Sequence, residues 1–150
     1  MVFLDANPFI IDRFFRRDAV YAANRRFLGR LPDLSAIVPA AILLELCGVA
    51  SFRLSRDELE RWMWSFDSIY SVRILDPFGA DEVSAGMWFS SYTEDIERYL
   101  ARRMTFGDAM LAREADRNGA EAIVTWNVKD FVGRTATAIF TPEQYLARVP

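Results

Sequence analysis

The sequence predicts an α/β protein whose parallel sheet is covered by helices on both faces. Short apolar runs alternate along the chain with longer segments of helical periodicity. This alternation favours a parallel sheet, because parallel neighbours need a crossover connection that is usually a helix. The chain has 150 residues, of which 52% are hydrophobic, so we expect one domain with a substantial core spanning residues 1–150.

Five short apolar runs are the expected strands: 2–4, 36–38, 72–75, 122–126 and 137–140. Helices are expected in the intervals and at the end: 7–15, 21–31, 40–50, 55–70, 81–103, 105–118 and 142–147. Ser55 followed three residues later by Glu58 predicts a capping box at the start of one of them. In a sheet of this kind the ligand crevice lies beyond the carboxyl ends of the strands, so the residues that directly follow strands are candidates for function.

The composition excludes several kinds of chemistry. The chain has no histidine, which removes Ser-His and Cys-His catalysis, histidine general bases and the usual zinc sites. Its one cysteine, Cys47, cannot form an internal disulfide, and we expect it to be a small buried residue of a cytoplasmic protein. No apolar run approaches the roughly 20 residues of a membrane span.

The charge balance gives no overall basic signature of nucleic-acid binding, since the net charge is −3 and the pI is about 5.0. A carboxylate site filled with divalent cations would still present positive charge to a phosphate.

Two acidic residues occupy informative positions in the first third of the chain. Asp5 directly follows the first expected strand, although a helix N-cap, which Asn7 can also supply, explains it equally well. Glu45 is the only charged residue between Pro39 and Ala50. Burying a lone carboxylate on such an apolar helix is costly, so we favour a functional carboxylate facing a cleft over a solvent-facing one.

Two further acids follow later in the chain. Thr105 and Asp108 have the spacing of a capping box, which on its own makes Asp108 structural. Asn127 and Asp130 follow the fourth strand in an expected loop, where such residues commonly support turns. The expected fold would bring several of these acids to one edge of the sheet, where divalent cations would relieve the repulsion between their carboxylates. Oxygen ligands select Mg²⁺ or Mn²⁺ over Zn²⁺.

Four segments resemble the PIN-domain ribonucleases, most closely their VapC-like toxin branch: FLDANPFI, VPAAILLEL, TFGDAMLAREADRNGAEAIVTWNVKDF and IFTPEQYL. The third is the most specific, while residues 51–103 carry no motif. The resemblance implies a three-layer α/β/α sandwich with a five-stranded parallel sheet and a Mg²⁺- or Mn²⁺-dependent endoribonuclease. It also implies an RNA substrate, pairing with a second copy and an antitoxin partner.

The resemblance assigns the catalytic and metal-binding positions to Asp5, Glu45, Asp108 and Asp130. Asn127 is the alternative to Asp130, and the supporting polar residues are Asn7, Thr125 and Asn127. Asp5 and Asp108 are expected to hold the metal, with Glu45 and Asp130 completing one or two ion sites directly or through water.

RNA contacts are expected from the early arginines: Arg13, Arg16, Arg17, Arg25 and Arg26. A solvated helical face is an alternative explanation of these charges. Six large apolar residues are expected mostly in the core, with some at a dimer or partner interface: Trp62, Trp64, Phe66, Met87, Trp88 and Phe89.

Three other functions stay open. The first is a housekeeping RNA-processing PIN nuclease, and the second is a PIN-like interaction module with a dead site. The third is a haloacid-dehalogenase-like phosphatase, suggested only by the early Asp5, since position 7 is Asn7 and not a second aspartate.

Overall fold

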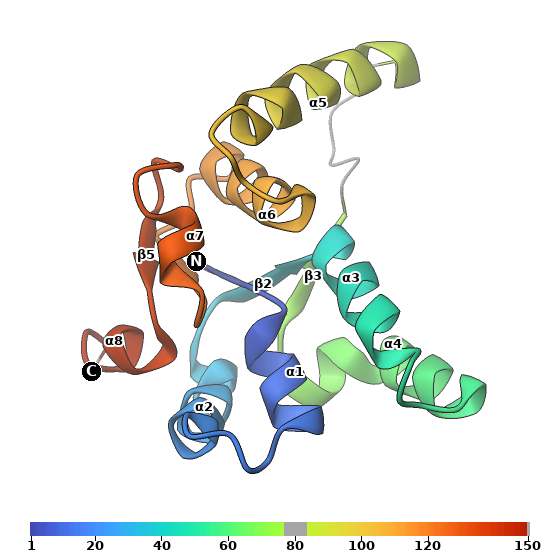
Figure 1. Ribbon diagram of the computed structural model, residues 1–150, viewed down its shortest axis with the longest axis vertical. Coiled ribbons are helices and arrows are strands. Elements are labelled where there is room, and N and C mark those ends of the chain that lie inside the picture. The colour runs from blue at the N-terminus through green and yellow to red at the C-terminus, as the bar shows by residue number, and fades with distance from the viewer. Residues whose placement is uncertain (77–83, 150) are drawn as a thin grey trace.

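The sheet is parallel throughout and has five strands in the order β3-β2-β1-β4-β5, in a computed structural model that describes residues 1–76 and 84–149 (Figure 1). The strands are β1 (Val2–Leu4), β2 (Ala36–Pro39), β3 (Arg73–Leu75), β4 (Ala122–Val124) and β5 (Ala138–Phe140). The central strand β1 pairs Val2 with Ala36 on one side and with Ala122 on the other. The expected α/β class and five-stranded parallel sheet are confirmed.

Eight helices cover the sheet in the described part of the chain: α1 (Asn7–Phe14), α2 (Tyr21–Leu28), α3 (Ala40–Ala50), α4 (Arg56–Tyr70), α5 (Ala85–Leu100), α6 (Phe106–Arg117), α7 (Val128–Phe131) and α8 (Pro142–Leu146). A short 3₁₀ turn, Leu31–Asp33, precedes β2. In Figure 1, α5 and α6 lie above the sheet and α1, α2 and α4 below it, as expected of a three-layer sandwich.

Most helix boundaries follow local signals. Ser55 and Glu58 form the expected capping box of α4, and Thr105 caps α6 by accepting a hydrogen bond from the N–H of Asp108. The helix expected over 81–103 is observed as α5, while residues 81–83 lie outside the described residues. Helix α7 occupies residues expected to form a loop, because a four-residue helix is too short to show a hydrophobic period.

The core lies on both faces of the sheet, against α6 on one side and α1 and α4 on the other. All three residues of β1 and of β4 are buried, and Phe9 of α1 packs edge-on against Phe66 and Tyr70 of α4. Cys47 is buried, as expected. No helix within residues 1–76 and 84–149 is both long and apolar enough to span a membrane.

Of the six large apolar residues, fewer lie in the core than expected, since Trp62 and Phe66 are buried and Trp88 is partly buried. By contrast, Trp64, Met87 and Phe89 are 75%, 66% and 63% exposed. They lie on the outward faces of α4 and α5, and high hydrophobicity alone does not reveal which face of a helix is covered.

Candidate active site at the carboxyl edge of the sheet

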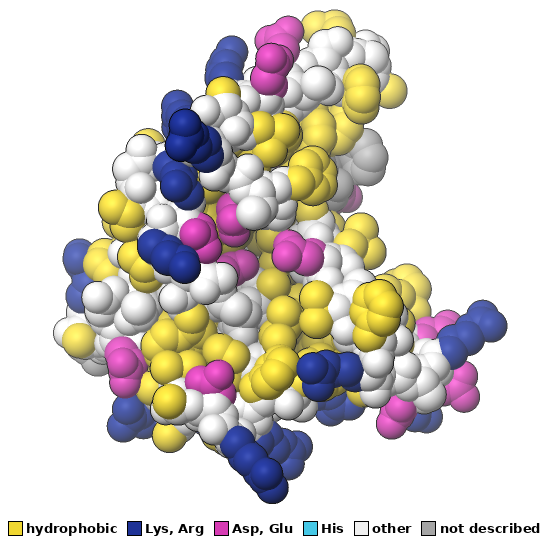
Figure 2. Space-filling model, viewed as in Figure 1, with side chains coloured by type: hydrophobic (Ala, Val, Ile, Leu, Met, Phe, Trp, Pro, Cys, Tyr) yellow, Lys and Arg dark blue, Asp and Glu magenta, His cyan; other side chains and the backbone are white. Residues whose placement is uncertain are grey.

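Acidic side chains from distant parts of the sequence meet beyond the carboxyl ends of the central strands. Because Leu4 of β1 is paired with Val124 of β4, the residues that follow these strands, Asp5 and Thr125, are neighbours. The N–H of Asp5 donates to the carbonyl oxygen of Val124 at 3.2 Å. Figure 2 shows acidic side chains gathered in a hollow below α6, between α7 and α3.

Asp5 is buried and held by donors on both carboxylate oxygens. Its Oδ1 accepts from the N–H of Ala6 at 2.6 Å. Its Oδ2 accepts from the hydroxyl of Thr125 at 2.6 Å and from Nδ2 of Asn7 at 2.5 Å. The helix begins after Ala6 without a side-chain cap, so the N-cap explanation of Asp5 was wrong. The structure instead places Asp5 as the anchored centre of a polar network.

That network ties the start of α1 to the end of β4. Thr125 is fully buried, and its oxygen also accepts from Nδ2 of Asn7 and from the N–H of Asn127, both at 2.9 Å. Oδ1 of Asn7 accepts from the N–H of Trp126 at 3.0 Å. Of the three supporting polar residues, Asn7 and Thr125 therefore contact Asp5 through their side chains, whereas Asn127 contributes its backbone.

Electrostatics at Asp5 disfavour the charged form. The pKa of Asp5 is raised to about 6. Burial is the largest cause, the hydrogen bonds from Thr125 and Ala6 act in the opposite direction, and the nearby charges of Asp108 and Glu45 add to the rise. These two charge effects show that Asp5, Asp108 and Glu45 are close enough to repel one another.

Asp108 is half-buried in the first turn of α6. Its Oδ2 accepts from the hydroxyl of Thr105 at 2.6 Å, while its N–H donates to the same hydroxyl at 3.3 Å. Burial raises the pKa of Asp108, the Thr105 hydrogen bond lowers it and the charge of Asp130 raises it. Asp108 is thus part of the helix cap and of the acidic cluster at once.

Glu45 reaches the cluster from α3, but from an exposed position. The same helix also exposes Leu44 and Val49, so Glu45 does not stand alone in an apolar, fully covered helix. Its carboxylate lies against Gly107, where an added Cβ would overlap Oε2 and lie 3.1 Å from Cδ. Partial desolvation and the charge of Asp108 raise the pKa of Glu45.

The fourth position lies on α7 and not in a loop as expected. Asp130 is half-buried and acts on Asp108 through its charge, while the side chain of Asn127 is exposed. The structure therefore brings Asp130 to the cluster more clearly than Asn127.

Three residues of the site were missed from the sequence. Gly107 leaves room for the Glu45 carboxylate. Its position directly before Asp108 is the feature of the sequence that could have indicated this role. Arg134 donates to the carbonyl oxygen of Asp130 at 2.9 Å, and its charge lowers the pKa of Asp108. Buried Asn24 accepts from Nε1 of Trp126 at 2.9 Å and donates to the carbonyl oxygen of Pro8 at 2.7 Å, bracing the end of β4 against α1.

The donors of the cluster fit a hard divalent cation. Within the described part of the chain, no group of three or more acidic or cysteine side chains already has the spacing of a metal site. The donor atoms are all oxygens, however, and burial and mutual repulsion raise the pKa of Asp5, Asp108 and Glu45. A cation would remove this repulsion, and oxygen-only donors suit Mg²⁺ or Mn²⁺.

The expected RNA-binding arginines lie apart from this cluster. Arg13, Arg16 and Arg25 line a pocket among α1, α2 and α4, and Arg17 lines a neighbouring one. Nη2 of Arg26 lies 3.9 Å from Glu143. The structure thus gathers three of the five at one place.

Searches by sequence gave no match to a family model or to a curated protein. Solved structures do match. VapBC2 from Rickettsia felis, solved with a DNA fragment of its promoter, is 19% identical with a TM-score of 0.64, over 94% of this chain and 98% of that one. The sarcin-ricin-loop-cleaving toxin VapC20 of Mycobacterium tuberculosis is 16% identical with a TM-score of 0.56, over 82% and 87%.

A toxin–antitoxin complex from Klebsiella pneumoniae is 19% identical with a TM-score of 0.56, over 95% of this chain and 98% of that one. The similarity extends over nearly the whole described fold. The chain therefore has the fold of the VapC-like PIN-domain toxins, which confirms the fold that the sequence resemblance implied.

Proposed function

We propose that this chain is a Mg²⁺- or Mn²⁺-dependent endoribonuclease that acts as the toxin of a type II toxin–antitoxin pair. The observation that carries the proposal is the meeting of Asp5, Glu45 and Asp108 at one edge of the sheet, where each has a raised pKa. Carboxylates brought together in this way repel one another, and a bound divalent cation would remove that repulsion. The fold shared with an RNA-cleaving toxin supports RNA as the substrate.

In this proposal Asp5 and Asp108 hold the cation, and Glu45 and Asp130 complete its coordination directly or through water. A bound cation supplies an activated water and neutralises charge on the phosphate. The chain's own residues supply the geometry: Thr125 and Asn7 orient Asp5, and Thr105 orients Asp108. Gly107 leaves the space into which Glu45 reaches.

The proposed partners follow from the fold and the surface. Structures of the same fold include toxin–antitoxin complexes, which supports an antitoxin partner. The exposed Trp64, Met87 and Phe89 are apolar surface that an antitoxin or a second copy would cover.

The experiment is a cleavage assay on single-stranded RNA with added Mg²⁺ or Mn²⁺, comparing the parent chain with Asp5→Asn and Asp108→Asn. The matched control is Asp57→Asn, because Asp57 is an exposed acid in the first turn of α4 and does not belong to the cluster. We expect cleavage to be lost in the first two variants and kept in the control. Equal cleavage in all four proteins would refute the site.

A further inference from the structure

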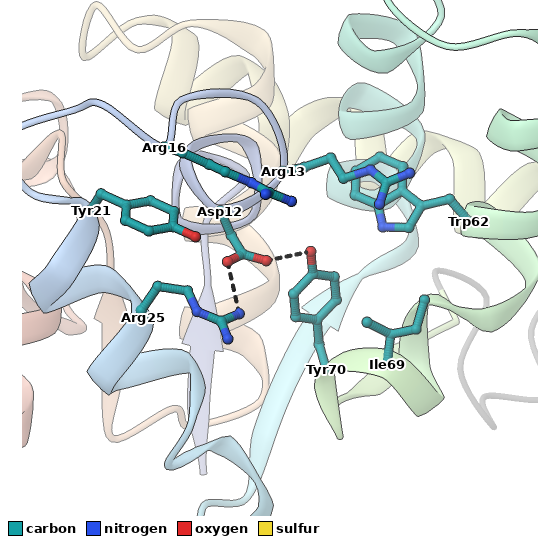
Figure 3. A pocket seen from close by; sticks show the side chains of 8 residues that line it. All are labelled: Asp12, Arg13, Arg16, Tyr21, Arg25, Trp62, Ile69 and Tyr70. Carbon is teal, nitrogen blue, oxygen red and sulfur yellow. Dashed lines mark hydrogen bonds and ion pairs between the residues drawn. The ribbon is translucent and has the colours of Figure 1, made fainter.

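A second polar site lies on the layer of α1, α2 and α4. It is a pocket of about 320 Å³ whose lining includes Asp12, Arg13, Arg16, Tyr21, Arg25 and Tyr70. Figure 3 shows Arg16, Tyr21 and Tyr70 directed toward Asp12 at its centre. None of these residues belongs to the carboxylate cluster.

The pocket carries an excess of positive charge. Its three arginines face one acid, Asp12, and that acid is already engaged. Oδ1 of Asp12 lies 3.0 Å from Nη1 of Arg25, and its Oδ2 accepts from the hydroxyl of Tyr70 at 3.0 Å. Asp12 therefore neutralises Arg25 and leaves the charges of Arg13 and Arg16 uncompensated within the pocket.

Arg13 and Arg16 differ in their surroundings. Arg13 lies over the ring of Trp62, with Cζ 5.9 Å from the ring centroid, so its stem is supported. Arg16 follows the end of α1, is exposed and has no ion-pair partner among the residues that the structure describes. A guanidinium that is near a wall of the pocket and free of a counter-ion is available to a ligand.

The donors match the chemistry of a phosphate group. Guanidinium groups bind phosphate oxygens with paired, charge-assisted hydrogen bonds. Burial and the neighbouring Asp12 raise the pKa of Tyr70, so its hydroxyl stays protonated and holds Asp12 in place. The hydroxyl of Tyr21 adds a neutral donor on the opposite wall.

We propose that this pocket binds a phosphate group at a site separate from the carboxylate cluster. Helix α1 connects the two sites: it starts with Asn7, which contacts Asp5, and it carries Asp12 and Arg13 near its other end. At about 1.5 Å per helical residue, Asn7 and Arg13 are roughly 9 Å apart along the axis. The phosphate therefore belongs either to a polynucleotide that extends past the cluster or to a small phosphate compound bound on its own.

The test compares binding by the parent chain, Arg16→Gln and Arg56→Gln. Arg56 is an exposed arginine at the start of α4 outside the pocket, so its substitution removes the same charge elsewhere. The probes are inorganic phosphate, AMP and a 12-nucleotide single-stranded RNA, measured by calorimetry or fluorescence anisotropy. A chelator is present throughout, so the readout does not depend on cleavage or on the proposed nuclease activity.

We expect Arg16→Gln to weaken binding of at least one probe by about tenfold, the size of one charge-assisted contact, and Arg56→Gln to leave it unchanged. Tyr21→Phe, which keeps the charge, should weaken the same probe by a smaller factor. If phosphate or AMP binds in this way, the ligand is a small phosphate compound.

If RNA alone responds, and its salt dependence falls by about 0.7 in log–log slope, the phosphate belongs to a polynucleotide. The proposal is overturned if no probe binds the parent chain, or if Arg16→Gln and Arg56→Gln change every affinity equally. Circular dichroism of each variant checks that the fold is kept.

Discussion

Replacing Gly107 by alanine tests whether the position of the Glu45 carboxylate matters. A Cβ at position 107 would overlap Oε2 of Glu45 and lie 3.1 Å from its Cδ and 3.3 Å from its Oε1. The carboxylate is the end of a flexible side chain, so it moves and the backbone of α6 does not. A displacement of about 1 Å in a catalytic group can cost roughly 10²-fold in rate.

Gly107→Ala should leave the free energy of unfolding unchanged or raise it slightly, although it lowers the rate of cleavage. Alanine is favoured over glycine inside a helix by roughly 0.5–1 kcal/mol, so the variant is not expected to unfold more easily. We therefore expect kcat/KM for metal-dependent RNA cleavage to fall by about 10- to 100-fold while the free energy of unfolding is kept.

Gly48→Ala is the control for this experiment. Gly48 also lies in a helix, and a Cβ there would meet no atom within 4 Å. Its cleavage rate should equal that of the parent, with a rise in unfolding free energy of up to about 1 kcal/mol. Urea denaturation and single-turnover cleavage measure the two quantities. A Gly107→Ala protein that cleaves at the parental rate would refute the positioning role.

Three other predictions concern the network around Asp5. Its folded-state pKa of about 6 exceeds the ordinary 3.8, so protonation stabilises the fold below pH 4 and this stability is lost as the pH rises to 6. At ~1.36 kcal/mol per pKa unit, the parent loses about 3 kcal/mol of unfolding free energy over this range. Urea titrations of the metal-free parent and Asp5→Asn at pH 4 and pH 7 measure it, because Asp5→Asn lacks the titrating group. A difference in unfolding free energy between the two proteins that is the same at both pH values would contradict the prediction. Thr125→Val leaves the donors of Asn7 and the N–H of Asn127 without their acceptor, and should cost about 1–3 kcal/mol in unfolding free energy, a prediction that an unchanged urea midpoint would exclude. Mn²⁺ should raise the unfolding temperature more at pH 7 than at pH 5, because protons compete for the carboxylates, and calorimetry showing an equal rise at both would count against the ion site.

Much of the fold was predictable because it depends on local patterns. The fully buried strands β1 and β4 are continuous apolar runs, and Ser55 with Glu58 marks the start of α4 in the sequence itself. The exposed faces were not predictable. Trp64 and Phe89 lie on the faces of α4 and α5 that point away from the sheet. The sequence does not distinguish them from core residues, because they are equally hydrophobic.

The site was predictable in outline and not in its details. The topological rule placed Asp5 at the carboxyl edge, and parallel pairing of β1 with β4 then brings Thr125 beside it. The exposure of Glu45 was not predictable, because it depends on how α3 packs against α6. The gathering of arginines into one pocket depends on the crossing of α1, α2 and α4, which one sequence does not show.

The most direct test of the central claim is the single-turnover rate of RNA cleavage measured against Mn²⁺ concentration for the parent, Asp108→Asn and Asp57→Asn. The proposed cation site predicts a saturable Mn²⁺ dependence in the parent and in Asp57→Asn, with a loss of roughly 10²-fold or more in Asp108→Asn. Cleavage that persists in a chelator, or that Asp108→Asn leaves unchanged, would contradict it.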